Sequence, residues 1–263
     1  GLGEAIRAAL DLRPARLVVG VGGSASTDGG SGMLAALGAR LLDAHGVELA
    51  DGGGALHGLG TVDLGPLDPR LREVELVLAA DVDSPLLGPR GAAAVFGPQK
   101  GATPTDVALL EAGLATFARA VAPDAVDRPG AGAAGGVGFA LLGVLGAERR
   151  PGAALVAELV GLDRTVVGAD LVVTGEGSLD PQTLTGKAVA EVARRAGAAA
   201  VPVVAVCGRC LLGPEELTAL GLAAAYPLSA LEPDPRRSMA DAAGLVRRTA
   251  ARVARERLSR RPG

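Results

Sequence analysis

The sequence is poor in the residues that several classes of protein need. It has no tryptophan, one tyrosine and three phenylalanines, so aromatic platforms for stacking nucleic-acid bases are not expected. No run of 18 uninterrupted apolar residues occurs, which argues against a transmembrane helix. A net charge of −3 gives no general attraction to nucleic acid or to a membrane surface. We therefore expect small-molecule partners, with no nucleic acid and no membrane among them.

Cysteine and histidine are scarce as well. With only two cysteines and no signal peptide at the start, we expect a cytoplasmic location. The spacing Cys207-Gly-Arg-Cys210 resembles a redox motif, but we favour two incidental thiols in a loop after a strand. The two histidines, His45 and His57, have no metal-ligand partner at a useful spacing, so both are expected on the surface.

Lysine is the rarest charged residue. Of 26 basic residues only Lys100 and Lys187 are lysines, and each lies beside glycine in a turn-like motif. A lysine ammonium is a compact charge that suits phosphate, whereas arginine is a planar fork. A phosphate-binding role is favoured for Lys187. For Lys100 it is balanced against the chance survival of a turn lysine.

The composition that remains is that of a globular α/β protein. A hydrophobic content of 49% over 263 residues is enough for one large or two modest domains. After Asp163, expected strands alternate with expected helices, which predicts a parallel doubly wound sheet of three strands with an exposed edge. The strands are expected at 171–173, 203–206 and 223–226, and the helices at 186–196, 214–220 and 238–258.

The first half of the chain has a less regular pattern. We expect strands at 17–21 and 74–80, helices at 3–12, 33–42, 90–96, 104–121 and 139–145, and irregular structure at 51–66. The glycine-rich stretch 129–138 contains no side-chain donor, so close packing is favoured over ligand binding. The chain starts with Gly1 inside an amphipathic pattern that has no clear N-cap, so we expect it to begin within a larger protein.

The segment 170–187 carries the strongest chemical signal. An apolar strand, Leu171 to Val173, is expected to break at Gly175-Glu176-Gly177, and the carboxylates of Glu176 and Asp180 follow within five residues. Carboxylates are ligands for Mg²⁺, the hydroxyl of Thr183 can donate to phosphate, and Lys187 stands at a helix entrance. Ligands of open α/β sheets bind at the carboxyl ends of strands, so this segment predicts phosphate chemistry.

Two further segments follow expected strands. The Gly/Ser loop after 17–21 offers backbone N–H groups and hydroxyls, and a ligand role is favoured there over a tight structural turn. It is not a P-loop motif. The acids Asp81 and Asp83 either bind a cation or hydroxyls, or form an Asx turn before Pro85, and the two interpretations are balanced. The loop candidates are Gly22, Gly23, Ser24, Ser26, Thr27 and Asp28.

Four long stretches in this order resemble the glycerate kinase type 1 family: residues 20–43, 80–102, 129–148 and 170–187. The resemblance implies a two-domain α/β protein. Residues 1–163 would be an inserted α/β domain with a mixed sheet and the Gly/Ser loop, and residues 164–263 the C-terminal half of a Rossmann-like parallel-sheet domain. It also implies that the N-terminal third of the family is absent. Ser84 stands where the family usually has Asn, which bears on fine specificity and not on the class.

The resemblance implies transfer of phosphate from ATP to D-glycerate with Mg²⁺, giving 2- or 3-phosphoglycerate, by a monomer or homodimer. Glu176, Asp180 and Lys187 would be catalytic, with Glu176 and Asp180 also holding Mg²⁺. The loop residues 22–28, Asp81, Asp83, Lys100 and Thr183 would bind substrate or phosphate.

Two other classes are considered. A Rossmann dehydrogenase is suggested by Gly20-Val-Gly22-Gly-Ser-Ala25, with Asp43 further on. It is disfavoured because these glycines lie at the end of the strand and the acidic segment would have no role. A non-catalytic fragment or regulatory module that binds a nucleotide or an organic acid stays open.

Overall fold

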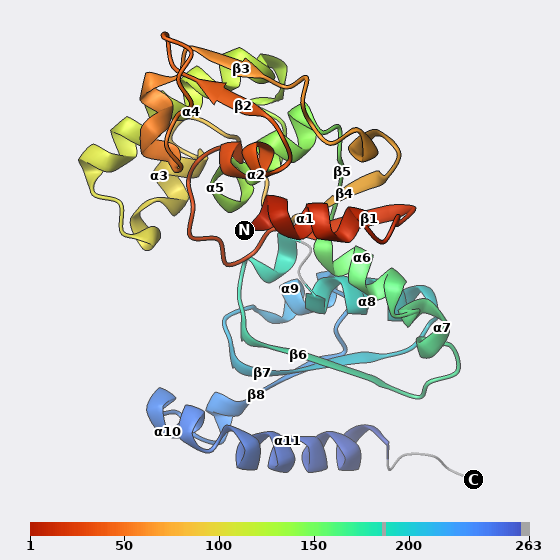
Figure 1. Cartoon of the computed structure of the whole chain (residues 1–263). Helices are drawn as coiled ribbons and strands as arrows, with labels where there is room; N and C mark the ends of the chain where they lie inside the picture. The colour runs from red at the N-terminus through yellow and green to blue at the C-terminus, as the bar shows by residue number, and fades with distance from the viewer. Residues whose placement is uncertain (186–187, 259–263) are drawn as a thin grey trace. The chain divides into compact units, whose positions relative to one another are not determined.

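The computed structural model describes residues 1–185 and 188–258 and divides the chain into two compact units, residues 1–152 and 153–263. Each unit combines parallel strands with helices, which confirms the expected α/β class (Figure 1). Among the described residues, no helix is long and apolar enough to cross a membrane. The assignment of the two units to an inserted and a Rossmann-like domain stays a prediction.

The first unit is built on a parallel sheet of three strands in the order β1-β4-β5, and a separate pair, β2 and β3, is antiparallel. The expected mixed sheet combines parallel and antiparallel strands. Both kinds of pairing occur in this unit, but in two separate sheets. Its helices and strands are α1 (Leu2–Leu10), β1 (Arg16–Gly20), α2 (Ser31–Ala36), β2 (Arg40–Leu42), β3 (Thr61–Asp63), β4 (Glu75–Ala79), α3 (Ala92–Phe96), α4 (Pro104–Val121), α5 (Ala133–Phe139) and β5 (Glu148–Arg150).

The core of the first unit forms around helix α4. The Thr103 side chain caps this helix by accepting from the Asp106 N–H, and Pro104 occupies the first turn, so the expected helix 104–121 is confirmed. Phe117 on α4 packs edge-to-face on Phe139 of α5, with ring centroids 5.9 Å apart, and both rings are fully buried.

The expected helix 33–42 is wrong in its second half. Helix α2 ends at Ala36, and Arg40 to Leu42 form β2. Gly38 has φ +112°, and a Cβ there would lie 2.3 Å from the carbonyl oxygen of Pro66. Only glycine fits this close approach, so the helical periodicity of the sequence is interrupted at this residue.

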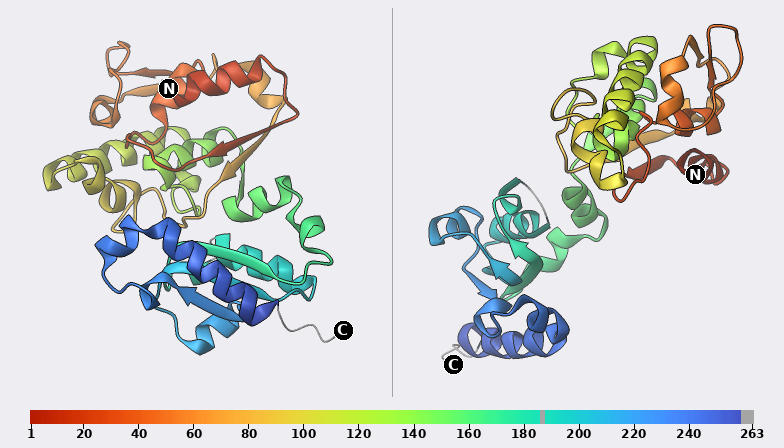
Figure 2. Two further views of the ribbon diagram at one scale, coloured as in Figure 1. Left: turned by 90° about the horizontal axis from the view of Figure 1, so that it is seen from below. Right: turned by 90° about the vertical axis from the view of Figure 1, so that its left-hand side faces the viewer.

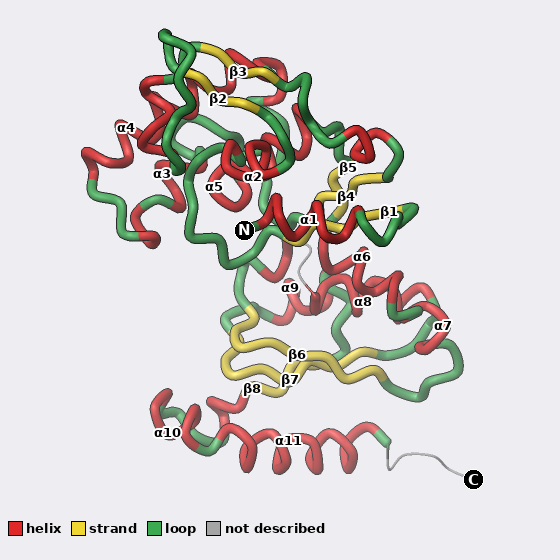
Figure 3. The backbone as a smooth tube through the Cα atoms, in the orientation of Figure 1, coloured by secondary structure: helices red, strands yellow, loops and turns green. Residues whose placement is uncertain are grey.

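The second unit is a three-stranded parallel sheet, as expected, and Figure 3 shows its strands lying side by side. Their order is β6-β7-β8. Its helices and strands are α6 (Gly152–Leu159), α7 (Leu162–Val166), β6 (Val172–Leu179), α8 (Ala188–Ala198), β7 (Val203–Cys210), α9 (Pro214–Ala219), β8 (Ala224–Pro227), α10 (Pro235–Ala240) and α11 (Ala242–Arg257). The expected C-terminal helix is thus two helices, which meet at Asp241.

Helices cover both faces of this second sheet (Figure 2). On one face, Val203, Ala205 and Cys207 pack with the α8 residues Val189 and Ala193. On the other face, Val204 and Tyr226 pack with Val253 of α11. Successive residues of a strand point to opposite faces, so the continuous apolar run of β7 serves both layers.

Strands β6 and β7 are longer than the sequence predicts. Glu176 pairs with Cys207 in the parallel ladder, and pairing continues to Leu179 opposite Cys210. The expected break at Gly175 is therefore wrong, because the glycines and Glu176 are held in the ladder by β7. The expected loop at Cys207 is wrong for the same reason.

Candidate functional site

The Gly/Ser loop of the first unit begins at the carboxyl end of β1, beside the end of its parallel neighbour β4. Gly22 and Gly23 are exposed. Asp28 is buried, and its carboxylate accepts from the N–H groups of Gly30 and Gly32 at 3.0 and 3.1 Å. Asp28 therefore stabilises the turn into helix α2. From the sequence alone, this structural role could not be told apart from ligand binding.

The glycine-rich stretch 129–138 supports this loop from behind. The N–H of Gly29 donates to the carbonyl of Gly135 at 3.0 Å. Gly135 has φ +68°, and a Cβ on it would lie 2.0 Å from the carbonyl oxygen of Ser26. The expected role of this stretch in close packing is confirmed, because only glycine permits the two backbones to approach so closely.

Lys100 reaches the same loop from the turn after α3. Its ammonium donates to the Ser24 hydroxyl at 2.9 Å and to the carbonyl oxygen of Ser26. Burial lowers the pKa of Lys100, and the Asp28 carboxylate opposes this shift more weakly. Of the two lysines, the structure thus places Lys100 on the expected loop. Thr27 is buried beneath it, and the Ser26 side chain is exposed.

A small cavity of about 150 Å³ opens beside this lysine. Its apolar lining comes from Val21 at the end of β1, Val82 after β4, and Phe96 of α3. Its polar lining includes Ser24, Gln99 and Lys100. A concave site at the carboxyl ends of parallel strands, with a few convergent polar groups, is the usual form of a small-molecule site.

Asp81 and Asp83 also follow β4, but both bond to other parts of the first unit. The Asp81 carboxylate accepts from the Gly152 N–H at 2.7 Å, and Asp83 pairs with Arg149 of β5 at 2.6 Å. The two acids thus secure the end of β5. Substrate binding by either residue stays a prediction.

In the second unit, Thr183 joins Glu176 and Asp180 into one cluster. Its hydroxyl donates to Glu176 Oε1 and accepts from the Asp180 N–H at 3.2 Å, and its side chain is fully buried. Asp180 Oδ1 accepts from the Gln182 N–H at 2.9 Å, so the chain turns sharply after β6. Because the Thr183 proton is directed at Glu176, a direct contact with phosphate would require this bond to break. Phosphate binding by Thr183 stays a prediction.

The two acids of this cluster fit the chemistry of a magnesium site. Mg²⁺ is commonly held by one or two carboxylates together with substrate phosphates and water. Among the described residues, no group of three or more His, Cys, Asp or Glu side chains forms a metal site. Glu176 and Asp180 alone would supply only part of the octahedral shell of a Mg²⁺ ion. Lys187, the third expected catalytic residue, lies outside the described residues.

The two cysteines are unsuited to redox chemistry. Cys207 and Cys210 are both free, and both pack with the same apolar cluster of the second unit. Burial raises the pKa of the Cys207 thiol to about 12, with smaller contributions from Cys210 and Glu176. This agrees with the expectation of incidental thiols.

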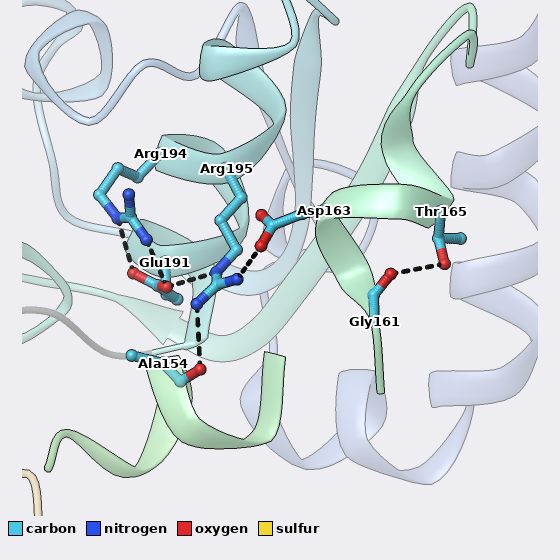
Figure 4. A network of polar contacts seen from close by, with 7 residues as sticks. All are labelled: Ala154, Gly161, Asp163, Thr165, Glu191, Arg194 and Arg195. Atoms are coloured by element: carbon cyan, nitrogen blue, oxygen red, sulfur yellow. Dashed lines mark hydrogen bonds and ion pairs between the residues drawn. The ribbon is translucent and has the colours of Figure 1, made fainter. Parts of the chain in front are cut away.

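A buried ion-pair network that the sequence analysis missed anchors helix α8, which follows the acidic segment (Figure 4). Arg195 is 9% exposed and donates to Glu191 of its own helix, to Asp163 of α7 and to the Ala154 carbonyl of α6. Arg194 also pairs with Glu191 at 2.7 Å and lowers the pKa of that carboxyl. The i, i+4 spacing of Glu191 and Arg195 is a signal that the sequence contains. The contact to Asp163 exists only in the fold.

The fold and these two groups of residues define an α/β protein with a lysine-bound Gly/Ser loop and an acidic segment at strand ends. A sequence model of the glycerate kinase family matches residues 1–258, and the chain belongs to this family.

The chain is similar to several named relatives. It is 50% identical over 212 residues to a glycerate kinase of Bacillus subtilis (strain 168), an alignment that covers 79% of this chain and 56% of the relative. It is 43% identical over 212 residues to a glycerate 2-kinase of Escherichia coli (strain K12), with the same shares covered. A crystal structure of a provisionally named glycerate kinase 2 from Salmonella typhimurium LT2 superposes with a TM-score of 0.73 at 43% identity, covering 86% of this chain and 59% of that one. The chain thus spans little more than half the length of these relatives.

Proposed function

We propose that this chain is part of a glycerate kinase that transfers the γ-phosphoryl group of ATP to a hydroxyl of D-glycerate, in the cytoplasm and with Mg²⁺. The observation that carries the proposal is the 42–50% identity to relatives named as glycerate kinases in Bacillus subtilis, Halalkalibacterium halodurans and Escherichia coli. The geometry supports it, because each unit places polar groups where α/β proteins bind anionic ligands.

The reaction needs positioning and charge neutralisation more than covalent help. A glycerate hydroxyl oxygen forms a bond to the γ-phosphorus, the bond to the bridging oxygen of ADP breaks, and the hydroxyl proton passes to a carboxylate. Asp180 and Glu176 are the carboxylates proposed to receive this proton or to hold Mg²⁺. When bound, Mg²⁺ supplies charge neutralisation on the phosphate oxygens.

The remaining residues are proposed to bind. Lys187 contacts phosphate at the entrance of α8, and Gly22, Gly23, Ser24 and Thr27 bind a phosphate or the glycerate carboxylate. Asp81 and Asp83 orient glycerate hydroxyls. Monomer and homodimer both stay open.

The test is ADP formation from ATP, MgCl₂ and D-glycerate, with D-lactate as a matched acid that lacks the second hydroxyl. ADP formation that requires D-glycerate supports the kinase. Ligand-induced thermal stabilisation without any ADP would instead support the alternative, a non-catalytic module that binds a nucleotide or an organic acid.

A further inference from the structure

Lys100 is a partly buried cation for which the described residues supply no counter-ion. No carboxylate of residues 1–185 or 188–258 lies within ion-pair distance of its Nζ, which bonds only to the Ser24 hydroxyl and the Ser26 carbonyl oxygen. The Asp28 carboxylate, the acid that acts on Lys100 most directly, already accepts two backbone N–H groups. A partly desolvated ammonium that makes hydrogen bonds but no ion pair, beside a cavity, is well placed to bind an anionic ligand.

The size and lining of the cavity restrict the choice of anion. Its volume of about 150 Å³ is below the range of roughly 300–1,000 Å³ that pockets for larger ligands occupy. Among the described residues that line it, Lys100 is the only one with a charged side chain, and the walls at Val21, Val82 and Phe96 are apolar. A triphosphate carries several negative charges and needs several cations, whereas one ammonium balances one carboxylate.

We propose that this cavity is the carboxylate subsite of the acceptor, in which Lys100 binds the carboxylate of a small hydroxy acid and the nucleotide is bound elsewhere. The inference rests on the proposed function for the identity of that acid as D-glycerate. Lys100 has three N–H donors, two of which are used within the loop, so a third remains for the ligand. Gln99, also in the lining, supplies an amide for a substrate hydroxyl.

The two bonds that Lys100 makes to the loop explain how it is positioned. They hold the ammonium at the mouth of a backbone turn that Asp28 and Gly135 fix independently. An arginine at this position keeps the charge, but its planar fork does not match the hydroxyl and carbonyl that hold the compact ammonium. K100R is therefore expected to disturb the loop although it keeps the positive charge.

The experiment is isothermal titration of D-glycerate and, separately, of ATP with MgCl₂ into the full chain. The variants are K100M, K100R and S24A, with R72M as a matched control at an exposed arginine of the same unit. We expect K100M to weaken D-glycerate binding by about tenfold or more, because a hydrogen bond to a charged group is lost. ATP affinity should stay within about twofold, S24A should show a smaller loss of glycerate affinity, and R72M should match the wild type.

The outcomes separate this inference from the proposed function. Loss of ATP binding in K100M, with glycerate binding intact, overturns the carboxylate subsite and leaves the kinase proposal standing. Wild-type chain that binds D-lactate through Lys100 but forms no ADP from D-glycerate supports the subsite and favours the non-catalytic binding module over the kinase. Binding of neither acid overturns the subsite. If K100M melts far below the wild type, the comparison rests on S24A, and unchanged glycerate affinity in a folded S24A then overturns the role of this loop.

Discussion

The hydroxyl of Thr183 donates a hydrogen bond to the Glu176 carboxylate, although seven residues separate the two along the chain. Thr183 is fully buried in the turn after β6, whereas Glu176 is a half-buried residue of the strand itself. Thr183, in the turn after the strand, therefore fixes the rotamer of Glu176, which is proposed to be catalytic.

This relationship predicts the effects of two substitutions at Thr183. Thr183→Val removes the hydroxyl, so Glu176 loses its orientation, and kcat should fall about tenfold to hundredfold, as when outer-sphere partners of ligands are removed. Thr183→Ser keeps the hydroxyl and should recover most of kcat. The measurements are kcat, the KM for ATP, and binding of the Mn²⁺–nucleotide complex followed by electron paramagnetic resonance. Equal losses of kcat in the Val and Ser variants would show that the hydrogen bond to Glu176 alone does not account for the effect.

Asp180 is the second acid of this cluster. Asp180→Asn should reduce kcat by orders of magnitude, since an amide can neither accept the hydroxyl proton nor bind Mg²⁺ as well as a carboxylate. Asp124→Asn is the matched control, because Asp124 is an exposed acid of the other unit. Steady-state ADP release under saturating substrates tests the prediction, and near-normal turnover would remove Asp180 from the mechanism.

Two glycines with the same backbone conformation allow the cost of backbone strain to be measured separately from the cost of steric overlap with neighbouring atoms. Gly135 and Gly146 have φ of +68° and +69°, but only at Gly135 does an added Cβ meet other atoms, the nearest at 2.0 Å. Gly146→Ala should cost about 1–2 kcal/mol of unfolding free energy for the left-handed conformation alone. Gly135→Ala should cost more and also weaken ligand binding at the Gly/Ser loop. Urea unfolding of both variants measures the two losses of unfolding free energy. Equal losses would contradict the close packing of Gly135 against the Ser26 backbone.

Glu191 gives the second unit a defined dependence of stability on pH. Its pKa is lowered, first by the bond from Arg194, so the folded state holds this carboxyl ionised more strongly than the unfolded state does. The stabilisation is therefore complete above the ordinary pKa of about 4.5, and is lost as pH falls through the lowered value of the folded state.

Glu191→Gln removes this contribution and leaves the buried Arg195 with less negative charge around it. The unfolding free energy at pH 7 should fall by about 3 kcal/mol, and the decline of stability as the pH falls below the ordinary pKa of about 4.5 should become shallower. Urea unfolding at a series of pH values is the measurement. Glu215→Gln, at an exposed acid of α9, is the control that should change neither quantity.

Thr249 on α11 is a site where a substitution should stabilise the protein. Its side chain is 3% exposed, and within the described part of the chain its hydroxyl has no hydrogen-bond partner. Burying an unsatisfied hydroxyl costs about 1–3 kcal/mol, so Thr249→Val should raise the unfolding free energy by about 1 kcal/mol or more. Thr249→Ser keeps the hydroxyl, loses a buried methyl group and should destabilise. A drop in melting temperature for Val would mean that the hydroxyl is satisfied in solution.

The sequence by itself determined the α/β class, the three parallel strands of the second unit and the segments that carry candidate chemistry. These follow from local causes: apolar runs of strand length, the capping sequence at Thr103, and glycines flanking Ser24 and Lys100. Local signals suffice because backbone preference and hydrophobic periodicity act over a few residues.

Only the tertiary structure decided which of these groups meet. Pairing with β7 keeps Glu176 in a strand, although the glycines beside it predict a loop. The close approach of Gly38 to Pro66 interrupts the helical pattern after α2, although the periodicity of the sequence continues. The approach of Lys100 to Ser24 joins residues 76 positions apart, and Arg195 meets Asp163 across 32 positions. No local pattern encodes these distances along the chain, because they depend on how separate elements pack around a shared core.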